Sequence, residues 1–165
     1  MTARWAKLLL VAGIAADYTL VVFDNLTDFD SNYQFVRHVL LMDSTFPGNH
    51  GMWRAIHSPG LHLAFYWAII VWEIVTMALL WWGAVRLLRA VCQPAAEFNS
   101  RKQMAIAGLT LSLLMWLVAF IDVGGDWFMM WQSTAWNGQQ AAFRMFAIVG
   151  LVLLLLLQPD ADSRP

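Results

Sequence analysis

The chain has 165 residues, of which 60% are apolar and only 13% charged, with ten Trp, ten Phe and a formal net charge of −1. This composition excludes disordered proteins, coiled coils and basic nucleic-acid-binding proteins, each of which needs a different balance of residues. A single cysteine, Cys92, excludes an intrachain disulfide and a cysteine-based metal site.

Four segments are apolar and long enough to cross a bilayer. A hydrocarbon core about 30 Å thick needs roughly 20 apolar residues per helix, because a helix satisfies its own backbone polar groups where water cannot. The sequence therefore predicts an all-α integral membrane four-helix bundle, a single transmembrane domain over residues 1–165. The predicted spans cover about residues 5–24, 61–86, 103–125 and 138–158.

The first span contains acidic residues at helical spacing. Arg4 and Lys7 before an apolar run loosely resemble a signal peptide, but the run continues to Phe23, which favours an uncleaved span. One stripe of this helix is expected to face the bundle interior, and it comprises Gly13, Asp17, Leu20 and Asp24.

The first loop, residues 25–60, is too long for a simple connection and too short for a core of its own. Ser31 followed by Gln34 is typical of a capping box, and the apolar spacing after it predicts a short helix at about residues 32–42. We expect this helix to lie on the outer membrane surface or to cap the bundle.

Histidines of the same loop form a weak candidate metal site. His50, Arg54 and His57 would share one face if residues 50–57 were helical, and His62 follows at the top of the second span. Imidazoles bind copper and zinc, but the positive charge of Arg54 disfavours a cation beside it. Interfacial hydrogen bonding is the favoured interpretation, and the sequence assigns no cofactor.

The second span places an acid at the middle of the membrane. An ionisable side chain there costs about 3 kcal/mol on insertion scales, so Glu73 is expected to turn inward and to bond Thr76, Tyr66 or a backbone carbonyl in its neutral form. The neutral acid would hold helices together. The alternatives are that Glu73 relays a proton or cation, or holds a charge for a basic residue or ligand head group from another subunit. The predicted interior stripe comprises His62, Tyr66, Ile69, Glu73 and Thr76.

The third and fourth spans complete a predicted intramembrane polar cluster. Arg144 is expected to form a bidentate pair with Asp122, Asp126 or Asp17 near the outer interface. The stripe of the third span comprises Gly108, Ser112, Met115, Ala119, Asp122 and Asp126. The whole predicted cluster comprises Asp17, Glu73, Asp122, Asp126 and Arg144.

An aromatic ledge follows the third span. Such a surface anchors a bundle in headgroups, docks a partner or lines an opening for a lipid or quinone. The ledge comprises Trp127, Phe128, Trp131 and Trp136, and with Arg54, His57 and His62 it forms the candidate binding surface of the outer side.

The basic residues predict the orientation, because Lys and Arg are retained on the cytoplasmic side. Seven fall on one side of the four-span arrangement and three on the other, so both termini are expected in the cytoplasm. The seven are Arg4, Lys7, Arg86, Arg89, Arg101, Lys102 and Arg164, and the three are Arg37, Arg54 and Arg144.

Several runs of the chain resemble a bacterial family known as predicted small integral membrane proteins, a domain-of-unknown-function family. The resemblance implies a four-span inner-membrane protein and supplies no activity or cofactor. It is carried by residues 23–28, 36–43, Glu73, 124–133 and 136–139.

Three functions are compatible with these features. The leading hypothesis is an accessory or structural subunit that binds a larger membrane protein complex, or a second copy of itself, through the outer loop and the aromatic ledge. The second is an oligomer that translocates protons or small cations through Glu73, and the third is a redox subunit with a quinone, haem or metal near Arg54, His57 and His62. Hydrolytic and phosphoryl-transfer motifs are absent from the sequence, so an enzyme is not favoured.

Overall fold

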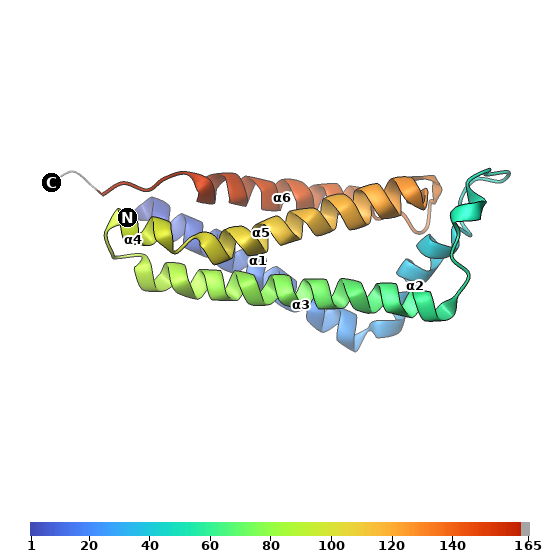
Figure 1. Cartoon of the computed structure of the whole chain (residues 1–165), viewed down its shortest axis with the longest axis horizontal. Coiled ribbons are helices and arrows are strands. Elements are labelled where there is room, and N and C mark those ends of the chain that lie inside the picture. The colour runs from blue at the N-terminus through green and yellow to red at the C-terminus, as the bar shows by residue number, and fades with distance from the viewer. Residues whose placement is uncertain (163–165) are drawn as a thin grey trace.

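The computed structural model describes residues 1–162, and every regular element in them is helical. Four long helical rods run side by side and form one elongated bundle (Figure 1). Each rod is long and apolar enough to cross a membrane, as the sequence predicts. The rods are α1 (Thr2–Thr27), α3 (Pro59–Ala90), α5 (Gln103–Leu114) continued by η2 (Met115–Trp127), and α6 (Gln139–Leu157).

Short elements close the bundle at its two ends. The cap end carries α2 (Phe29–Leu41), η1 (Met52–Arg54) and η3 (Met130–Gln132) (Figure 1). The opposite end carries α4 (Ala95–Ser100) and brings Met1 close to the last described residues of the chain. We call this second end the termini end.

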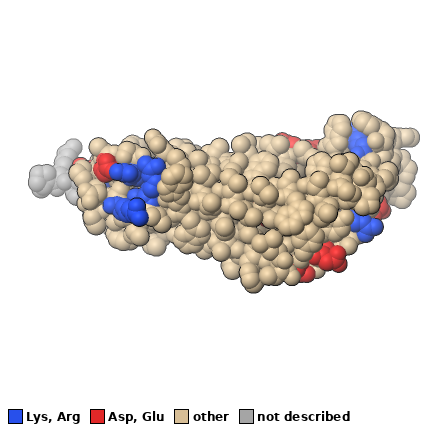
Figure 2. Space-filling model, turned by 60° about the horizontal axis from the view of Figure 1, so that its bottom comes forward, with Lys and Arg blue, Asp and Glu red and all other residues tan. Residues whose placement is uncertain are grey.

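The surface of the bundle suits a bilayer. On the face shown in Figure 2, charged side chains gather toward the two ends and the broad middle is uncharged. Helix α6 has 19 residues, about 28 Å at 1.5 Å per residue, which matches the hydrocarbon thickness. Large apolar side chains point outward along the rods, among them Leu20, Val71, Phe143 and Leu151.

Helix α3 is the centre of the packing, because it contacts both α1 and α5. Gly83 of α3 lies directly against the backbone of Ala105 in α5, and Gly108 lies against Leu80. Small residues at such crossings let membrane helices approach closely, which is a main source of their association. Toward the termini end the buried core is apolar and includes Val11, Leu80, Leu109 and Val149.

The start of α2 differs from the prediction. The helix begins at Phe29, because only Asp28 separates it from α1 and the N–H of Asp28 still bonds Asp24 O, at 2.8 Å. The expected capping box is not formed: Gln34 Nε2 donates to Asp30 Oδ1 at 3.3 Å instead.

Residues 50–57 do not form one continuous helix. Only Met52–Arg54 is helical there, as a single 3₁₀ turn, and Ala55 is extended. His50, Arg54 and His57 therefore do not share a helical face.

Candidate functional site

A buried acid near the midpoint of α3 is held by the end of α1. Glu73 is 3% exposed, and Asn25 Nδ2 donates to its Oε2 at 2.7 Å. The hydroxyl of Tyr66 lies 3.1 Å from both the backbone oxygen and the Oδ1 of Asn25. Asn25 thus uses both halves of its amide to join two α3 side chains.

A second buried hydrogen bond crosses the bundle beside this group. Tyr18 of α1 donates to Ser112 Oγ of α5 at 2.7 Å. Together these residues form what we call the polar interior, defined as Tyr18, Asn25, Tyr66, Glu73 and Ser112. Hydrogen bonds between helices in hydrocarbon fix their register, and this network joins three of the four rods.

The partner of Glu73 differs from the sequence prediction. Thr76 donates to the backbone oxygen of Trp72 at 2.8 Å, and Tyr66 reaches Asn25 rather than the acid. The buried face of α3 does contain His62, Tyr66, Glu73 and Thr76.

The structure does not bring the five residues of the predicted polar cluster together. Asp17 is half-buried, whereas Asp122, Asp126 and Arg144 are exposed, and Arg144 forms no ion pair among residues 1–162. Asp122 and Asp126 are exposed because η2 is a π-helix. Its wider turns rotate later residues away from the face on which α-helical spacing would place them. In α1 the buried face passes through Tyr18 and Asn25 instead of Asp17.

The cap end is a cross-linked unit. The N–H of Ile56 donates to Leu40 O at 2.9 Å, which ties the loop to α2. Ser44 donates to Ser133 at 2.8 Å, and the N–H of Phe46 donates to Gln132 Oε1 at 3.0 Å. These bonds join the first loop to the segment after η2 over a small buried core of Leu40, Met42 and Phe128.

This cap presents exposed aromatic rings around an arginine. The guanidinium of Arg54 lies 5.3 Å from the ring centre of Trp53 and 5.0 Å from that of Trp127, and Nη1 donates to Trp127 O at 3.3 Å. Trp53 is nevertheless 71% exposed. Trp53 and Trp127 form one edge-to-face pair with ring centres 5.8 Å apart, and Phe46 and Trp131 form a second at 5.7 Å. We call the set of Phe46, Trp53, Trp127 and Trp131 the cap aromatic face.

The ledge expected from the sequence is only partly one surface. Phe128 is buried, and Trp136 pairs with two rings of α2: it stacks on His38 with the ring centres 4.5 Å apart and meets Phe35 edge to face. His62 is buried and donates through Nε2 to Ile56 O at 2.7 Å.

The candidate histidines do not assemble into a metal site. His50 and His57 are exposed on the cap loop, while His62 is buried at the top of α3. Within residues 1–162, no three His, Cys, Asp or Glu side chains lie close enough to hold a metal ion.

The termini end contains an ionic cluster that sequence reasoning missed. Lys7 of α1 and Lys102, just before α5, both place Nζ 2.7 Å from Asp160 Oδ2. Both also donate to the backbone oxygen of Gln158, at 2.7 and 2.8 Å. We call Lys7, Lys102 and Asp160 the Asp160 clamp; all three side chains are nearly fully buried.

The clamp depends on ionisation of Asp160. Burial raises the pKa of this carboxyl, but the ammonium groups of Lys102 and Lys7 outweigh burial and hold the pKa below its usual range. The contribution of the clamp to stability is therefore fully present above the unfolded-state pKa of an aspartate, about 3.9. It is lost as the pH falls through the lower pKa that Asp160 has in the folded chain.

Arg4 extends this attachment of the tail. Its Nη2 lies 2.9 Å from Asp162 Oδ1, and its Nη1 donates to Gln93 O at 2.6 Å. Asp162 Oδ1 also accepts the N–H of Ala95 at 2.8 Å. In the sequence the tail is only a short polar end, and nothing local marks its acids as partners of residues some 150 positions earlier. Arg164 lies outside the described residues.

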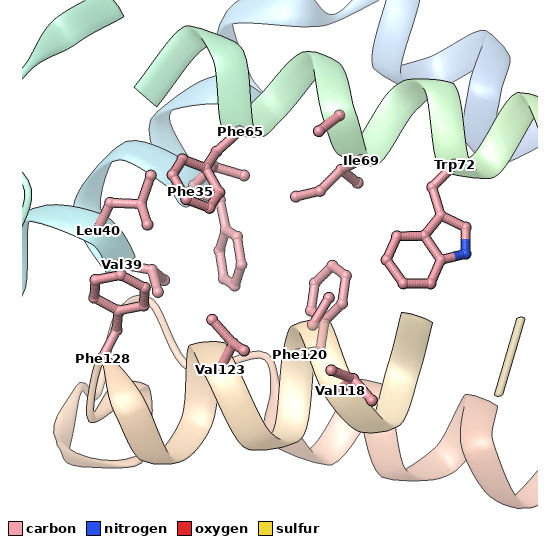
Figure 3. Close-up of a pocket in the computed structure, with 13 residues that line it drawn as sticks. Phe35, Val39, Leu40, Phe65, Ile69, Trp72, Val118, Phe120, Val123 and Phe128 are labelled. Atoms are coloured by element: carbon pink, nitrogen blue, oxygen red, sulfur yellow. The ribbon is translucent and has the colours of Figure 1, made fainter. Parts of the chain in front are cut away.

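A lateral apolar cavity of about 300 Å³ opens between α2, α3 and η2 (Figure 3). Side chains of α3 such as Phe65 and Ile69 point toward Phe120 and Val123 of η2 across it. Every residue that lines it is apolar, so the cavity offers no group to orient a polar ligand head. It contains none of Arg54, His57 and His62.

Comparison with known proteins identifies a family. A family model described as Predicted small integral membrane protein (DUF2165) matches residues 3–159, nearly the whole chain, which confirms the resemblance seen in the sequence. Neither the curated proteins nor the solved structures give a match.

Proposed function

We propose that this chain, which belongs to the family of predicted small integral membrane proteins, is an accessory or structural subunit that binds a larger membrane protein through its cap end. The observation that carries the proposal is the cap aromatic face around Arg54. Tryptophan and arginine dominate the binding energy of protein interfaces, and they do so most when they are held rigidly. Here the cap holds Trp53 and Trp127 edge to face, with the guanidinium of Arg54 within 5.3 Å of both ring centres, while leaving the rings exposed.

The interior supports a structural role for Glu73. Its carboxyl accepts a hydrogen bond from Asn25, and the buried α3 residues that follow toward the termini end include the apolar Leu80, Ala84 and Leu87. An oligomer that translocates protons or cations through Glu73 has less support, because the buried residues of α3 beyond Thr76 are apolar toward the termini end. A redox subunit also has less support, since His62 is bonded to a backbone carbonyl and Arg54 forms cation–π contacts with two rings.

Native mass measurement after gentle detergent extraction tests the partner proposal. We expect the wild-type chain to be recovered with a heavier membrane protein, and Trp53→Ala to lose at least about 2 kcal/mol of the association free energy, as hot-spot residues do. Trp53 is largely exposed, so the substitution leaves the fold intact.

The matched control is Trp82→Ala, which removes an equally large exposed ring from the lipid-facing side of α3. This variant should retain the partner. Recovery of the free chain alone from wild-type membranes would contradict the proposal, as would equal losses in the two variants. A homo-oligomer that Trp53→Ala dissociates would assign the same surface to a second copy.

We also propose that the protein resides in a bacterial inner membrane with its termini end in the cytoplasm. Among residues 1–162, six of the nine Lys and Arg residues lie at the termini end, and such residues are retained on the cytoplasmic side. The six are Arg4, Lys7, Arg86, Arg89, Arg101 and Lys102.

Cys92 offers a direct test of this orientation, because it is exposed in the connection between α3 and α4. In intact spheroplasts, a membrane-impermeant maleimide should leave Cys92 unlabelled, and detergent permeabilisation should raise labelling at least about tenfold, since charged probes cannot cross hydrocarbon. A Cys92→Ser chain with Thr134→Cys at the cap end should show full labelling without permeabilisation. The reverse pattern would overturn the orientation.

A further inference from the structure

The Asp160 clamp carries more positive than negative charge. Two buried ammonium groups share one oxygen of one carboxylate, so a unit positive charge stays unbalanced within it. Lys7 is 8% exposed and Lys102 is 4% exposed, and buried charge is screened weakly. An ammonium has three N–H donors, and each of these two lysines uses only two of its donors on Asp160 and Gln158. The arrangement therefore favours an additional anion.

A cavity of about 310 Å³ lies beside this excess charge, between α1, the end of α6 and the tail. Its polar wall is formed by Arg4, Lys7, Gln158 and Asp160. Its other wall includes Leu10 and Leu155, which are exposed on the uncharged part of the bundle surface. The cavity is thus cationic at the membrane surface and apolar toward the hydrocarbon.

We propose that this cavity binds an anionic phospholipid from the leaflet at the termini end. The phosphate would lie against Lys7 and Arg4, and the first part of an acyl chain would lie between Leu10 and Leu155. A phosphodiester contributes one negative charge, which balances the charge left over by the clamp. Basic pockets between membrane helices recognise anionic headgroups in this way, whereas a zwitterionic lipid brings its own cation beside Lys7.

The full chain, purified in detergent and incubated with phosphatidylglycerol and phosphatidylcholine at equal concentration, tests this by native mass measurement. We expect phosphatidylglycerol to be retained preferentially. Lys7→Gln should weaken its binding about fivefold, the effect of one basic residue at an anionic surface. Asp160→Asn should strengthen it, because the carboxylate that competes for the two ammonium groups is neutralised while its shape is kept.

The opposite shifts of these two variants separate lipid binding from a purely structural role, which predicts no gain for Asp160→Asn. The control is Arg89→Gln, the same charge change at an exposed site of the termini end outside the cavity. A circular dichroism melt identifies any variant that is unfolded, and the preference of the wild-type chain for phosphatidylglycerol tests the proposal even if a variant does not fold. Equal retention of the two lipids, an equal loss in Arg89→Gln, or no gain in Asp160→Asn would overturn it. Displacement of phosphatidylglycerol by equimolar inorganic phosphate would assign the cavity to a free oxyanion instead.

Discussion

Replacing Gly83 with Ala should lower the free energy of unfolding by about 1–3 kcal/mol, the usual cost of overpacking a well-filled core. A Cβ built on Gly83 would lie 2.5 Å from the backbone nitrogen of Ala105 and 2.6 Å from its Cα. Those atoms belong to the backbone of α5 and cannot move aside as a flexible side chain does. The two rods would have to separate along a contact that α3 makes through much of its length.

Unfolding by SDS titration in mixed micelles measures this effect, with Gly13→Ala as the control. The site of Gly13 is open, with no atom within 4 Å of the place that a Cβ would take, so this change should be neutral or stabilise α1 through the better helix propensity of Ala. Because the same propensity gain applies at Gly83, any loss there must come from the contact with α5. Equal midpoints for the two variants would show that the rods are not packed as closely as the structure has them.

The four rods and the buried face of α3 follow from sequence patterns for a simple physical reason. Hydrocarbon imposes helix length directly, and α-helical spacing then decides which residues share a face. His62, Tyr66 and Glu73 fall on one buried face because α3 is regular from end to end. The same reasoning fails in the third rod, where the change from α5 to the π-helix η2 shifts the face that carries Asp122 and Asp126.

The sequence alone does not predict which polar residues that are distant along the chain bond to one another. Asn25 stands at the end of the first span without a pattern that links it to Glu73, 48 positions later. The acids of the tail likewise have no local sign that Lys7 and Lys102 need them. A buried ammonium or carboxyl must find a partner, but which one it finds depends on how the rods pack. The partners of Lys7 and Lys102 therefore follow only from the fold.

Replacing Asn25 with Leu is expected to cost about 1–3 kcal/mol of unfolding free energy, because it leaves a buried acceptor without a donor. Leucine is no smaller than asparagine, so little of the loss is due to a cavity. The substitution removes the amide that donates to Glu73 Oε2 and the Oδ1 that accepts from Tyr66. Gln140→Leu, which removes an exposed amide near the start of α6, is the control and should leave SDS unfolding within about 0.5 kcal/mol of wild type.

A double-mutant cycle with Glu73→Leu separates loss of the hydrogen bond from other effects at Asn25. If the cost of Asn25→Leu arises because Glu73 is left unpaired, then removing the acid as well should recover most of it, with a coupling of about 0.5–3 kcal/mol. Glu73→Gln should behave differently, because its amide oxygen still accepts from Asn25 Nδ2 at the position of Oε2. This variant should stay within about 1 kcal/mol of wild type, the net worth of one hydrogen bond. Additive losses in the cycle would mean that the bond between Asn25 and Glu73 does not account for the cost of Asn25→Leu. A Glu73→Gln chain as unstable as Asn25→Leu would mean that the charge of Glu73 rather than its bond to α1 holds the rods together.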